Sequence, residues 1–213
     1  MVEKGKIVET VTAAITAAPK RKFQESVDIT INLKNVDLSQ PKNRIDETIL
    51  LPHTLGGIKI AVLGKGDITT QAKDARVELI MGPQEIERLG GAPREARKIA
   101  NEYRFFLAET TVMAQVGKHL GPRLGPRGRM PMPITSGTDI RPIVERLRSS
   151  VKIRTKDRKT FHTKVGSTEM DPALIAENVD AVLKRVESKL EQGALNIRSV
   201  YVKTTMGPAV RLM

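Results

Sequence analysis

The segment from Gly117 to Pro133, GKHLGPRLGPRGRMPMP, carries distinctive chemistry, because two Gly-Pro-Arg triplets stand four residues apart and no acidic residue accompanies them. Proline fixes φ and removes a backbone donor, while glycine lets a partner approach the backbone closely. The pattern predicts a stiff segment without regular secondary structure, from which Arg123, Arg127 and Arg129 project with little entropy to lose on binding. Such guanidinium groups suit either RNA phosphates or a contact with another domain. The plain alternative is a rigid surface linker.

A second candidate surface is the stretch KTTMGPAV near the end of the chain. Thr204 and Thr205 offer hydroxyl groups, and Met206 offers a flexible apolar group. Gly207 offers bare backbone against which a sugar or a base can pack. The plain alternative is an edge strand that ends at the Gly-Pro pair.

A third candidate, KRKFQES, places three bases, Phe23 and a glutamate directly before a predicted strand. Phe23 is either a core residue or an exposed aromatic ring pressed against a ribose. Aromatic residues are otherwise scarce, with no Trp, two Tyr and four Phe. Proteins that hold single strands usually stack bases on several aromatic rings. A folded RNA, read through phosphates, sugar hydroxyls and shape, therefore fits this chain better.

The sequence offers little for catalysis or metal binding. Its histidines, His53, His119 and His162, are far apart, and the chain has no cysteine, so we expect neither a metal site nor a disulfide. There is no Gly-x-Ser-x-Gly elbow and no Walker loop, and LGKGD after a buried strand is only a weak nucleotide-loop signal. We therefore expect no enzyme activity and no cofactor.

The charge of the chain points to a polyanion. Lys and Arg number 36 against 24 Asp and Glu, which gives a net charge of +12 and a pI near 10.1. A field of this sign attracts nucleic acid and releases its counterions on binding. Between Lys118 and Lys159 the acidic residues are only Asp139, Glu145 and Asp157. The basic residues of that stretch are Lys118, Arg123, Arg127, Arg129, Arg141, Arg146, Arg148, Lys152, Arg154, Lys156, Arg158 and Lys159.

The two ends of the chain share one style of secondary structure. Apolar and polar residues alternate in SVDITINLK, which is the period of a half-buried strand. In the segment 171–192 a single apolar stripe follows Asp171 and Pro172, which suit a helix N-cap and first position. The predicted elements are a helix over 3–18, strands in 26–34, 47–53 and 199–213, the last interrupted by Gly-Pro, a hairpin formed by 151–155 and 159–166, and a helix over 171–192.

The middle of the chain has a different style. A nearly unbroken apolar run, IKIAVLG, precedes a polar helical stretch, and RVELI and FFLAE are likewise followed by helical patterns. Buried strands that alternate with helices indicate a mostly parallel sheet. The fold we expect is an α+β terminal-halves domain, an antiparallel sheet with two helices, from 1–56 plus 151–213. An inserted three-layer α/β Rossmann-like domain spans 57–150, and its two connections act as a hinge.

Taken in order, KFQESVDITINL, LPHTLGG, the Gly-Pro-Arg segment, FHTKVGS and SVYVKTTMGPAV resemble the large-subunit ribosomal protein L-one family over essentially the whole chain. The RMPMPI ending of the basic segment is similar to the archaeal branch. The resemblance implies binding to the ribosomal RNA helices of the mobile stalk beside the transfer-RNA exit site. It also implies repression of translation through the leader of the protein's own messenger, contact with exit-site transfer RNA, and a cytoplasmic protein that is monomeric when free and has no membrane partner.

The resemblance also implies which residues bind RNA, and they agree with the hydroxyl, glycine and aromatic chemistry described above. Glu25 either accepts from a ribose hydroxyl or a guanine amine or fixes a neighbouring lysine. Arg123, Arg127 and Arg129 make a secondary RNA or interdomain contact. The predicted RNA-binding residues are Lys22, Phe23, Glu25, Ser26, His162, Lys164, Gly166, Thr204, Thr205, Met206, Gly207 and Pro208. The competing hypotheses are an enzyme that uses the middle domain on a phosphorylated ligand and a general RNA chaperone.

Overall fold

The computed structural model describes residues 3–155 and 158–213. Lys156 and Asp157 of the basic stretch therefore lie outside the described residues. The chain divides into two compact units, Met1–Leu55 with Ser149–Met213 and Gly56–Arg148, which we call the discontinuous unit and the inserted unit.

The main sheet of the discontinuous unit is antiparallel, with strand order β10-β9-β1-β8. It joins segments from both ends of the chain, as the alternation of residue types predicts. Val27, Ile29 and Ile31 are fully buried, while the polar residues between them are only half-buried. The strands are β1 (Ser26–Leu33), β8 (Thr160–Ser167), β9 (Ile197–Thr204) and β10 (Val210–Arg211).

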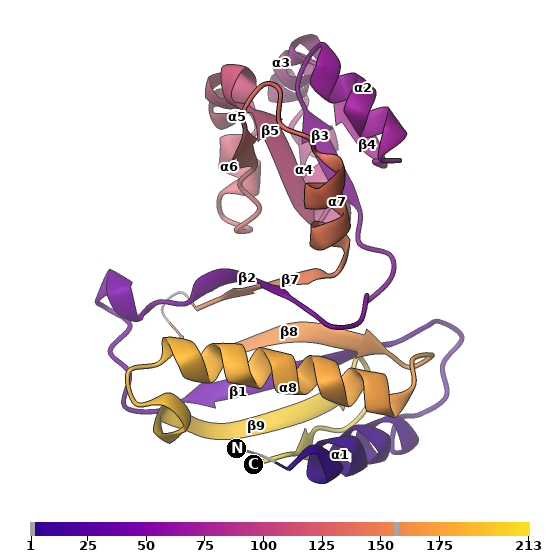
Figure 1. Cartoon of the computed structure of the whole chain (residues 1–213), viewed down its shortest axis with the longest axis vertical. Helices are drawn as coiled ribbons and strands as arrows, with labels where there is room; N and C mark the ends of the chain where they lie inside the picture. Colours follow the sequence, from indigo (N-terminus) through magenta and orange to yellow (C-terminus); the bar gives the residue numbers. More distant parts are fainter. Residues whose placement is uncertain (1–2, 156–157) are drawn as a thin grey trace. The chain divides into compact units, whose positions relative to one another are not determined.

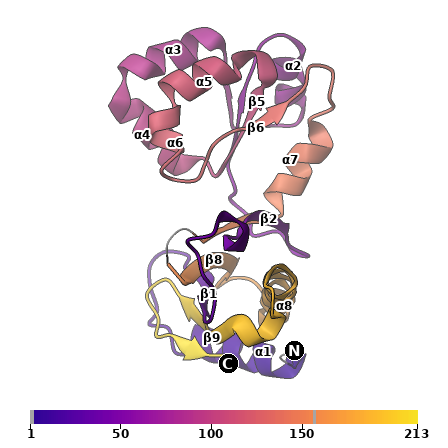
Figure 2. The same ribbon diagram turned by 90° about the vertical axis from the view of Figure 1, so that its left-hand side faces the viewer.

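Helices α1 (Lys4–Thr16) and α8 (Pro172–Lys189) pack against each other and against one face of this sheet (Figures 1 and 2). The predicted apolar stripe of α8 is buried, and Asp171 caps the helix by accepting a hydrogen bond from the Ala173 amide at 2.9 Å. Among residues 3–155 and 158–213, no helix combines the length and the apolar character needed to cross a bilayer. The opposite face of the sheet, which neither helix covers, is the polar one.

A second, two-stranded sheet consists of β2 (Asp46–Leu50) and β7 (Ser150–Arg154). The predicted hairpin of 151–155 with 159–166 is wrong, because β7 pairs with β2 while β8 pairs with β1 in the described part of the chain. Both strands have the expected alternation, but alternation does not specify a partner. Short 3-10 helices, Pro41–Asn43 and Gly193–Asn196, lie at turns of this unit.

The inserted unit is built on a parallel sheet with strand order β4-β3-β5-β6. Its central strands β3 (Ile60–Leu63) and β5 (Phe105–Glu109) are buried on both faces, as the apolar runs predict. One core gathers alternate residues of these strands with α3, α4 and α5, and a second core gathers the others with α2 and α7, so the unit has three layers (Figure 1). The other elements are α2 (Asp67–Asp74), β4 (Leu79–Met81), α3 (Pro83–Gly91), α4 (Pro93–Glu102), a 3-10 helix (Thr110–Val112), α5 (Met113–His119), α6 (Gly121–Leu124), β6 (Met132–Ile134) and α7 (Arg141–Arg148).

The Gly-Pro-Arg segment contains regular structure, so the prediction of an irregular segment is wrong. The end of α5, all of α6 and the start of β6 lie within it. Pro122 fits because it stands in the first turn of α6, where its missing N–H costs no hydrogen bond. The Gly125 amide then donates to the Gly121 carbonyl at 2.8 Å and closes the turn.

The two connections between the units leave the discontinuous unit side by side. Leu50 pairs with Ser150 across the small sheet, and the Leu51 amide donates to the Ser149 carbonyl at 2.8 Å. Only the first connection includes consecutive left-handed glycines, Gly56 and Gly57, with φ values of 62° and 65°. The hinge itself stays a prediction.

Candidate RNA interface

The stretches KFQES and TTMGP meet at one end of the main sheet, which we call the terminal junction (residues 22–26 and 204–208). Val27 pairs with Thr204 where β1 begins and β9 ends. Beyond this pair the Thr205 amide donates to the Ser26 carbonyl at 3.0 Å, and the Ser26 amide donates to Thr205 Oγ1 at 3.2 Å. The two hydroxyl groups are 3.0 Å apart, although their residues are separated by 179 positions in the sequence. Two distant candidate stretches therefore form one surface.

Glu25 fixes the shape of the terminal junction. Its side chain is 4% exposed, and Oε2 accepts a hydrogen bond from the Met206 amide at 3.0 Å. This amide, the Thr204 hydroxyl and the charges of Arg21 and Lys203 lower the pKa of Glu25 against the opposing effect of burial. The structure thus gives the carboxylate a role that the sequence did not suggest, which is to hold the backbone of Met206.

Thr204 and Gly207 shape the turn from within. Thr204 is fully buried, and its Oγ1 accepts a hydrogen bond from the Gly207 amide at 3.0 Å. A Cβ added to Gly207 would stand 2.4 Å from that oxygen and 3.2 Å from Ala18 Cβ. The expectation that the Thr204 hydroxyl faces RNA does not agree with this burial, because its hydroxyl is used inside the turn. Gly207 is required for close packing whether or not it also contacts a ligand.

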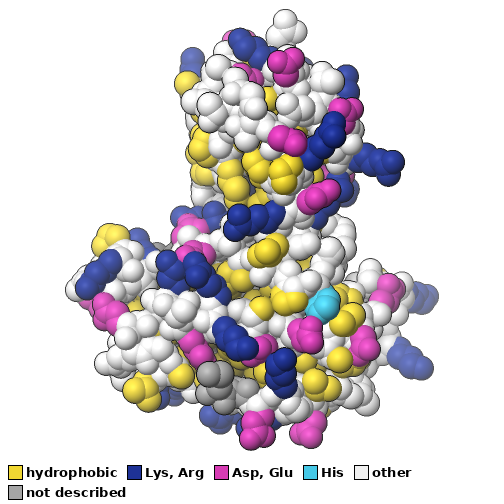
Figure 3. All heavy atoms as spheres, viewed as in Figure 1, with side chains coloured by type: hydrophobic (Ala, Val, Ile, Leu, Met, Phe, Trp, Pro, Cys, Tyr) yellow, Lys and Arg dark blue, Asp and Glu magenta, His cyan; other side chains and the backbone are white. Residues whose placement is uncertain are grey.

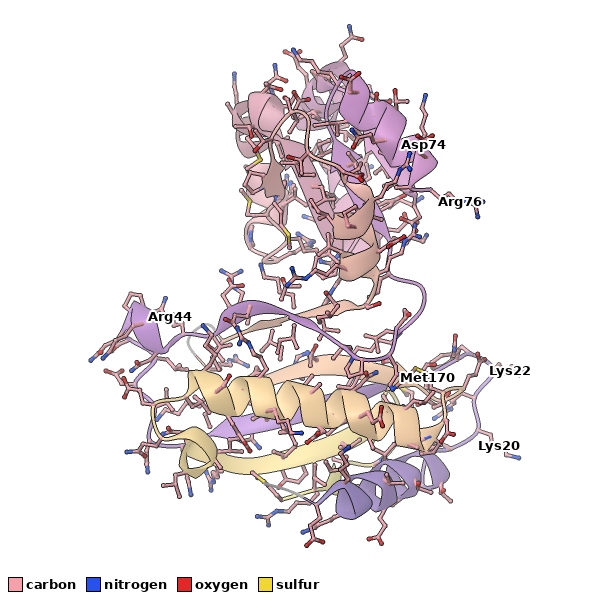
Figure 4. The ribbon with its side chains drawn as sticks, viewed as in Figure 1. Lys20, Lys22, Arg44, Asp74, Arg76 and Met170 are labelled. Carbon is pink, nitrogen blue, oxygen red and sulfur yellow. The ribbon has the colours of Figure 1, made fainter. Side chains whose placement is uncertain are left out.

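Two large apolar side chains are exposed at the same place. Phe23 and Met206 are each 54% exposed, so Phe23 is not a core residue. Lys22, Thr205 and Pro208 are exposed around them. Figure 4 shows Lys22 directed away from the segment that leads into β1. An apolar centre with hydroxyls and a base beside it can pack against riboses or bases and still donate hydrogen bonds.

The uncovered face of the main sheet extends this surface with cross-strand rows of polar residues. Asp28 stands between its partners Lys164 and Lys203, and Thr30 pairs with His162, which is exposed. Residues directly opposite in an antiparallel pair lie on the same side of the sheet. The other residues of this face are Asn32, Thr160, Ser199, Tyr201 and Arg211. Sequence reasoning missed most of them, although the polar positions of the alternating strands were the signal that could have found them.

The helical face of the discontinuous unit has a different character. Figure 3 shows basic and acidic side chains intermixed there. Glu47 binds both Arg185 and Lys189 of α8, with distances of 2.9 and 2.7 Å, and Lys184 binds Asp180 at 2.7 Å. These charges neutralise one another, so this part of the helical face offers no uniformly basic surface.

Gly166, a predicted binding residue, is buried against α8. A Cβ at this position would stand 2.7 Å from Cγ1 and 3.0 Å from Cδ1 of Ile175. The glycine therefore permits close packing of the helix on the sheet. This need accounts for the residue without any contact to RNA.

The three arginines of the Gly-Pro-Arg segment play unequal parts in the inserted unit. Arg129 donates through Nη1 to the carbonyls of Asn101 and Tyr103, at 2.9 and 3.0 Å, at the end of α4. Arg127 donates through Nε to Asn101 Oδ1 at 2.7 Å. The Arg123 side chain forms no hydrogen bond or ion pair within residues 3–155 and 158–213, and the Arg123 carbonyl accepts from Arg127 Nη1 at 3.0 Å. Arg129 thus stabilises its own domain, whereas Arg123 and Arg127 keep donors for a partner.

The weak nucleotide-loop signal, LGKGD, lies at the carboxyl ends of the parallel strands, where open α/β sheets usually bind ligands. Here the carboxylate of Glu109, which is 5% exposed, accepts from the Lys65 amide at 3.1 Å and from Ser136 Oγ at 3.2 Å. The Lys65 amide of this loop is therefore already bonded to the chain's own carboxylate. Within the described ranges, no group of three or more His, Cys, Asp or Glu residues could hold a metal ion.

Comparison with known proteins identifies the family. The pattern of the Ribosomal protein L1p/L10e family matches residues 14–208. Curated relatives named "Large ribosomal subunit protein uL1" from Methanoregula boonei and Methanoculleus marisnigri are 72% and 71% identical over the full length of both chains. One from Archaeoglobus fulgidus is 48% identical, again over both full lengths. These relatives are archaeal, which confirms the prediction from the basic segment. The family consists of structural proteins of the ribosome, so the expectation that the chain is not an enzyme is confirmed as well. The chain belongs to the ribosomal protein L1p/L10e family.

Proposed function

We propose that the chain is a constituent of the large ribosomal subunit and binds large-subunit ribosomal RNA to form the mobile stalk near the transfer-RNA exit site. The observation that carries this proposal is the terminal junction, where two stretches 179 residues apart join through Ser26 and Thr205. The name of the relatives, "Large ribosomal subunit protein uL1", supports the same assignment.

The chemistry of the junction suits a folded RNA. Phe23 and Met206 supply an apolar centre that packs on ribose or base. The hydroxyls of Ser26 and Thr205 are placed to exchange hydrogen bonds with 2′-OH groups, which distinguish RNA from DNA. The charge of Lys22 reaches phosphates at the rim of the junction.

The remaining predicted residues fall into two groups. His162 and Lys164 extend the contact along the open face of β8, and Pro208 stiffens the exposed turn. Glu25, Thr204, Gly166 and Gly207 act indirectly, because their side chains or their small size hold the surface in shape.

Further partners in this proposal rest on the family resemblance. A messenger leader that folds like the ribosomal site would bind the same junction, so the free protein would repress its own translation. Exit-site transfer RNA would meet the finished stalk. The protein acts in the cytoplasm, is a monomer when free, and needs no cofactor for any of these roles.

A filter-binding titration tests the ribosomal proposal, with the stalk segment of the organism's own large-subunit RNA as the probe. Met206→Ala removes an exposed apolar contact and leaves the hydrogen bond to the Met206 amide in place, so we expect a loss of about 1–3 kcal/mol in binding. Leu195→Ala is the matched control, because Leu195 is 70% exposed on the same unit but away from the junction.

Two results would defeat the proposal. One is equal binding of the stalk segment and an unrelated duplex RNA, which is the behaviour of a general RNA chaperone. The other is an equal effect of Met206→Ala and Leu195→Ala, which would place the contact elsewhere.

A further inference from the structure

Helix α8 carries a fully buried polar residue, Asn178, within its apolar stripe. Asn178 is 0% exposed, and Ile175, Val179 and Val182, which lie on the same side of the helix, are buried as well. A buried side-chain amide is tolerated only where its hydrogen bonds are formed. Asn is also a poorer helix former than Leu, which would suit such a position. The amide therefore indicates a specific contact, which the sequence analysis did not identify.

The side chain of Asn178 binds two other segments of the discontinuous unit. Its Oδ1 accepts a hydrogen bond from the His53 amide at 3.0 Å, and its Nδ2 donates to the His53 carbonyl at 3.2 Å. Nδ2 also donates to the Val165 carbonyl of β8 at 2.9 Å. The side chain thus pairs with both backbone groups of His53, as a neighbouring strand would, and ties them to β8. We call these three hydrogen bonds the Asn178 latch.

The Asn178 latch joins the proposed RNA-binding strand to the first connection between the units. Val165 lies between Lys164 and Gly166, two of the predicted binding residues. His53 lies in the first connection, three residues before its two left-handed glycines. Helix α8 and strand β8 lie beside each other (Figure 1), and Gly166 lets Ile175 of α8 approach the strand closely. Strand β8 is therefore a fixed support for the latch.

The latch is the buried part of the attachment of residues 51–55. These residues, all of them described, form neither helix nor strand. His53 Nε2 also contacts Glu177 Oε2 at 2.7 Å, but these side chains are 31% and 52% exposed, so water screens the contact. Opening the latch would leave the buried Val165 carbonyl without the Asn178 donor, which is unfavourable. The latch thus has two distinct states, closed and open.

We propose that the Asn178 latch couples RNA binding on β8 to the order of the first connection. A ligand that holds Lys164 restrains β8 at Val165, and the latch passes this restraint to residues 51–55. RNA binding and closure of the latch then favour each other, because a coupling free energy between two sites is reciprocal. This inference rests on the proposed function for its ligand, whereas the closed latch is a property of the protein without RNA.

Hydrogen exchange of the His53 amide, followed by NMR in the full chain, tests the latch in the protein without RNA. Asn178→Leu keeps a side chain of similar shape and removes all three hydrogen bonds. We expect the His53 amide to exchange at least about tenfold faster in this variant, since its acceptor is gone. Glu177→Ala is the matched control, because it removes only the exposed contact with the same histidine. Its exchange rate should stay within about twofold of the wild type.

The same measurement with the stalk RNA segment at saturation tests the coupling. RNA should slow exchange of the His53 amide roughly fivefold or more in the wild type and in Glu177→Ala. In Asn178→Leu the RNA should still bind, but the exchange rate should not change. The Leu51 amide is an internal reference, because it donates to the Ser149 carbonyl and takes no part in the latch. Its exchange should be the same with and without RNA.

Three results would overturn the inference: equal exchange of the His53 amide in the wild type and Asn178→Leu, no effect of bound RNA on this amide in the wild type, or equal slowing of the His53 and Leu51 amides. If Asn178→Leu does not fold, the wild type with and without RNA decides, with Leu51 as the reference. Failure of the ribosomal proposal has another signature, because the wild type would then not prefer the stalk RNA, while the comparison without RNA would still report on the latch.

Discussion

Two buried glutamates, one in each unit, each hold a loop by accepting a backbone hydrogen bond, but the two loops differ in their exposure. Glu25 accepts from the Met206 amide at 3.0 Å, and Glu109 accepts from the Lys65 amide at 3.1 Å. Each carboxylate holds a loop at the end of a strand, and in each case backbone hydrogen bonding is the largest cause of a lowered pKa. In the discontinuous unit the loop that is held projects outward. In the inserted unit the carboxylate is enclosed between the Lys65 amide and Ser136.

The difference lies in what surrounds the two glutamates. Around Glu25 the neighbouring Phe23 and Met206 are exposed, so a fixed backbone presents a surface to a partner. Around Glu109 the Lys65 amide and Ser136 Oγ donate to the carboxylate, and the residue is only 5% exposed. The carboxyl end of the parallel sheet is thus closed by the chain's own carboxylate, whereas one end of the antiparallel sheet presents exposed side chains, which we propose bind RNA.

The largest effect is expected from Glu25→Ala measured by RNA binding. The loss of the acceptor leaves the Met206 amide without its partner, so the turn loses its fixed shape and affinity for the stalk RNA should fall roughly ten- to hundredfold. Glu25→Gln should recover part of the loss, because its amide oxygen can still accept. Glu9→Ala, an exposed change on α1, is the control. If Glu25→Ala binds as tightly as Glu9→Ala, the turn does not depend on this carboxylate.

A smaller effect, a loss of stability, is expected from a change at Gly166. It tests whether this residue of the sheet serves packing or contact with RNA. Gly166→Ala brings a Cβ to within 2.7 Å of Ile175 Cγ1, which should destabilise the discontinuous unit by about 1–3 kcal/mol in urea unfolding. The double variant with Ile175→Ala should be less unstable than the sum of the two single changes, because the obstructing atoms are gone. An additive double variant would contradict the packing role.

Local periodicity predicted the elements that a single face determines. The alternation in β1 and the apolar stripe of α8 are properties of short segments, and both were correct. Helix α4 was missed because its buried residues are the small Ala96 and Ala100, which give no strong apolar stripe. The partners of β7 and β8 depend on the tertiary core, so alternation could not assign them.

In the candidate site, too, the sequence alone predicts some features, while others depend on the folded chain. Residue chemistry named Phe23, Thr205 and Met206 as candidates, and the structure shows that all three are exposed. The buried position of Thr204 and the contact of Glu25 with Met206 depend on segments that meet only in the folded chain. Sequence therefore named the candidate stretches, whose binding to RNA stays a prediction, whereas the contacts of each residue required the folded chain.

In the inserted unit, Glu109→Ala tests whether the carboxylate is a structural replacement for a ligand. Loss of its hydrogen bonds with the Lys65 amide and Ser136 should lower the free energy of unfolding by about 1–2 kcal/mol. RNA binding through the terminal junction should stay at the wild-type level, which is the reverse of the result expected for Glu25→Ala. A loss of RNA affinity without a loss of stability would show that the two glutamates do not differ in function.

The smallest effect is expected on the melting temperature at acid pH, and it tests whether the charge of Glu109 stabilises the fold. A carboxyl group whose pKa is lower in the folded chain than the usual value of about 4.3 stabilises the fold above that value, and this contribution is lost as the pH falls through the folded pKa. Glu109→Gln carries no such charge. Its melting temperature should therefore decline less steeply than that of the wild type below about pH 4.5. The difference is modest because Asp37, Glu47, Glu102 and Glu177 also have lowered pKa values and still titrate in the variant. Parallel decline of the two proteins would mean that a neutral acceptor serves the Lys65 amide equally well, and the ionised carboxylate would then not be what keeps this edge closed.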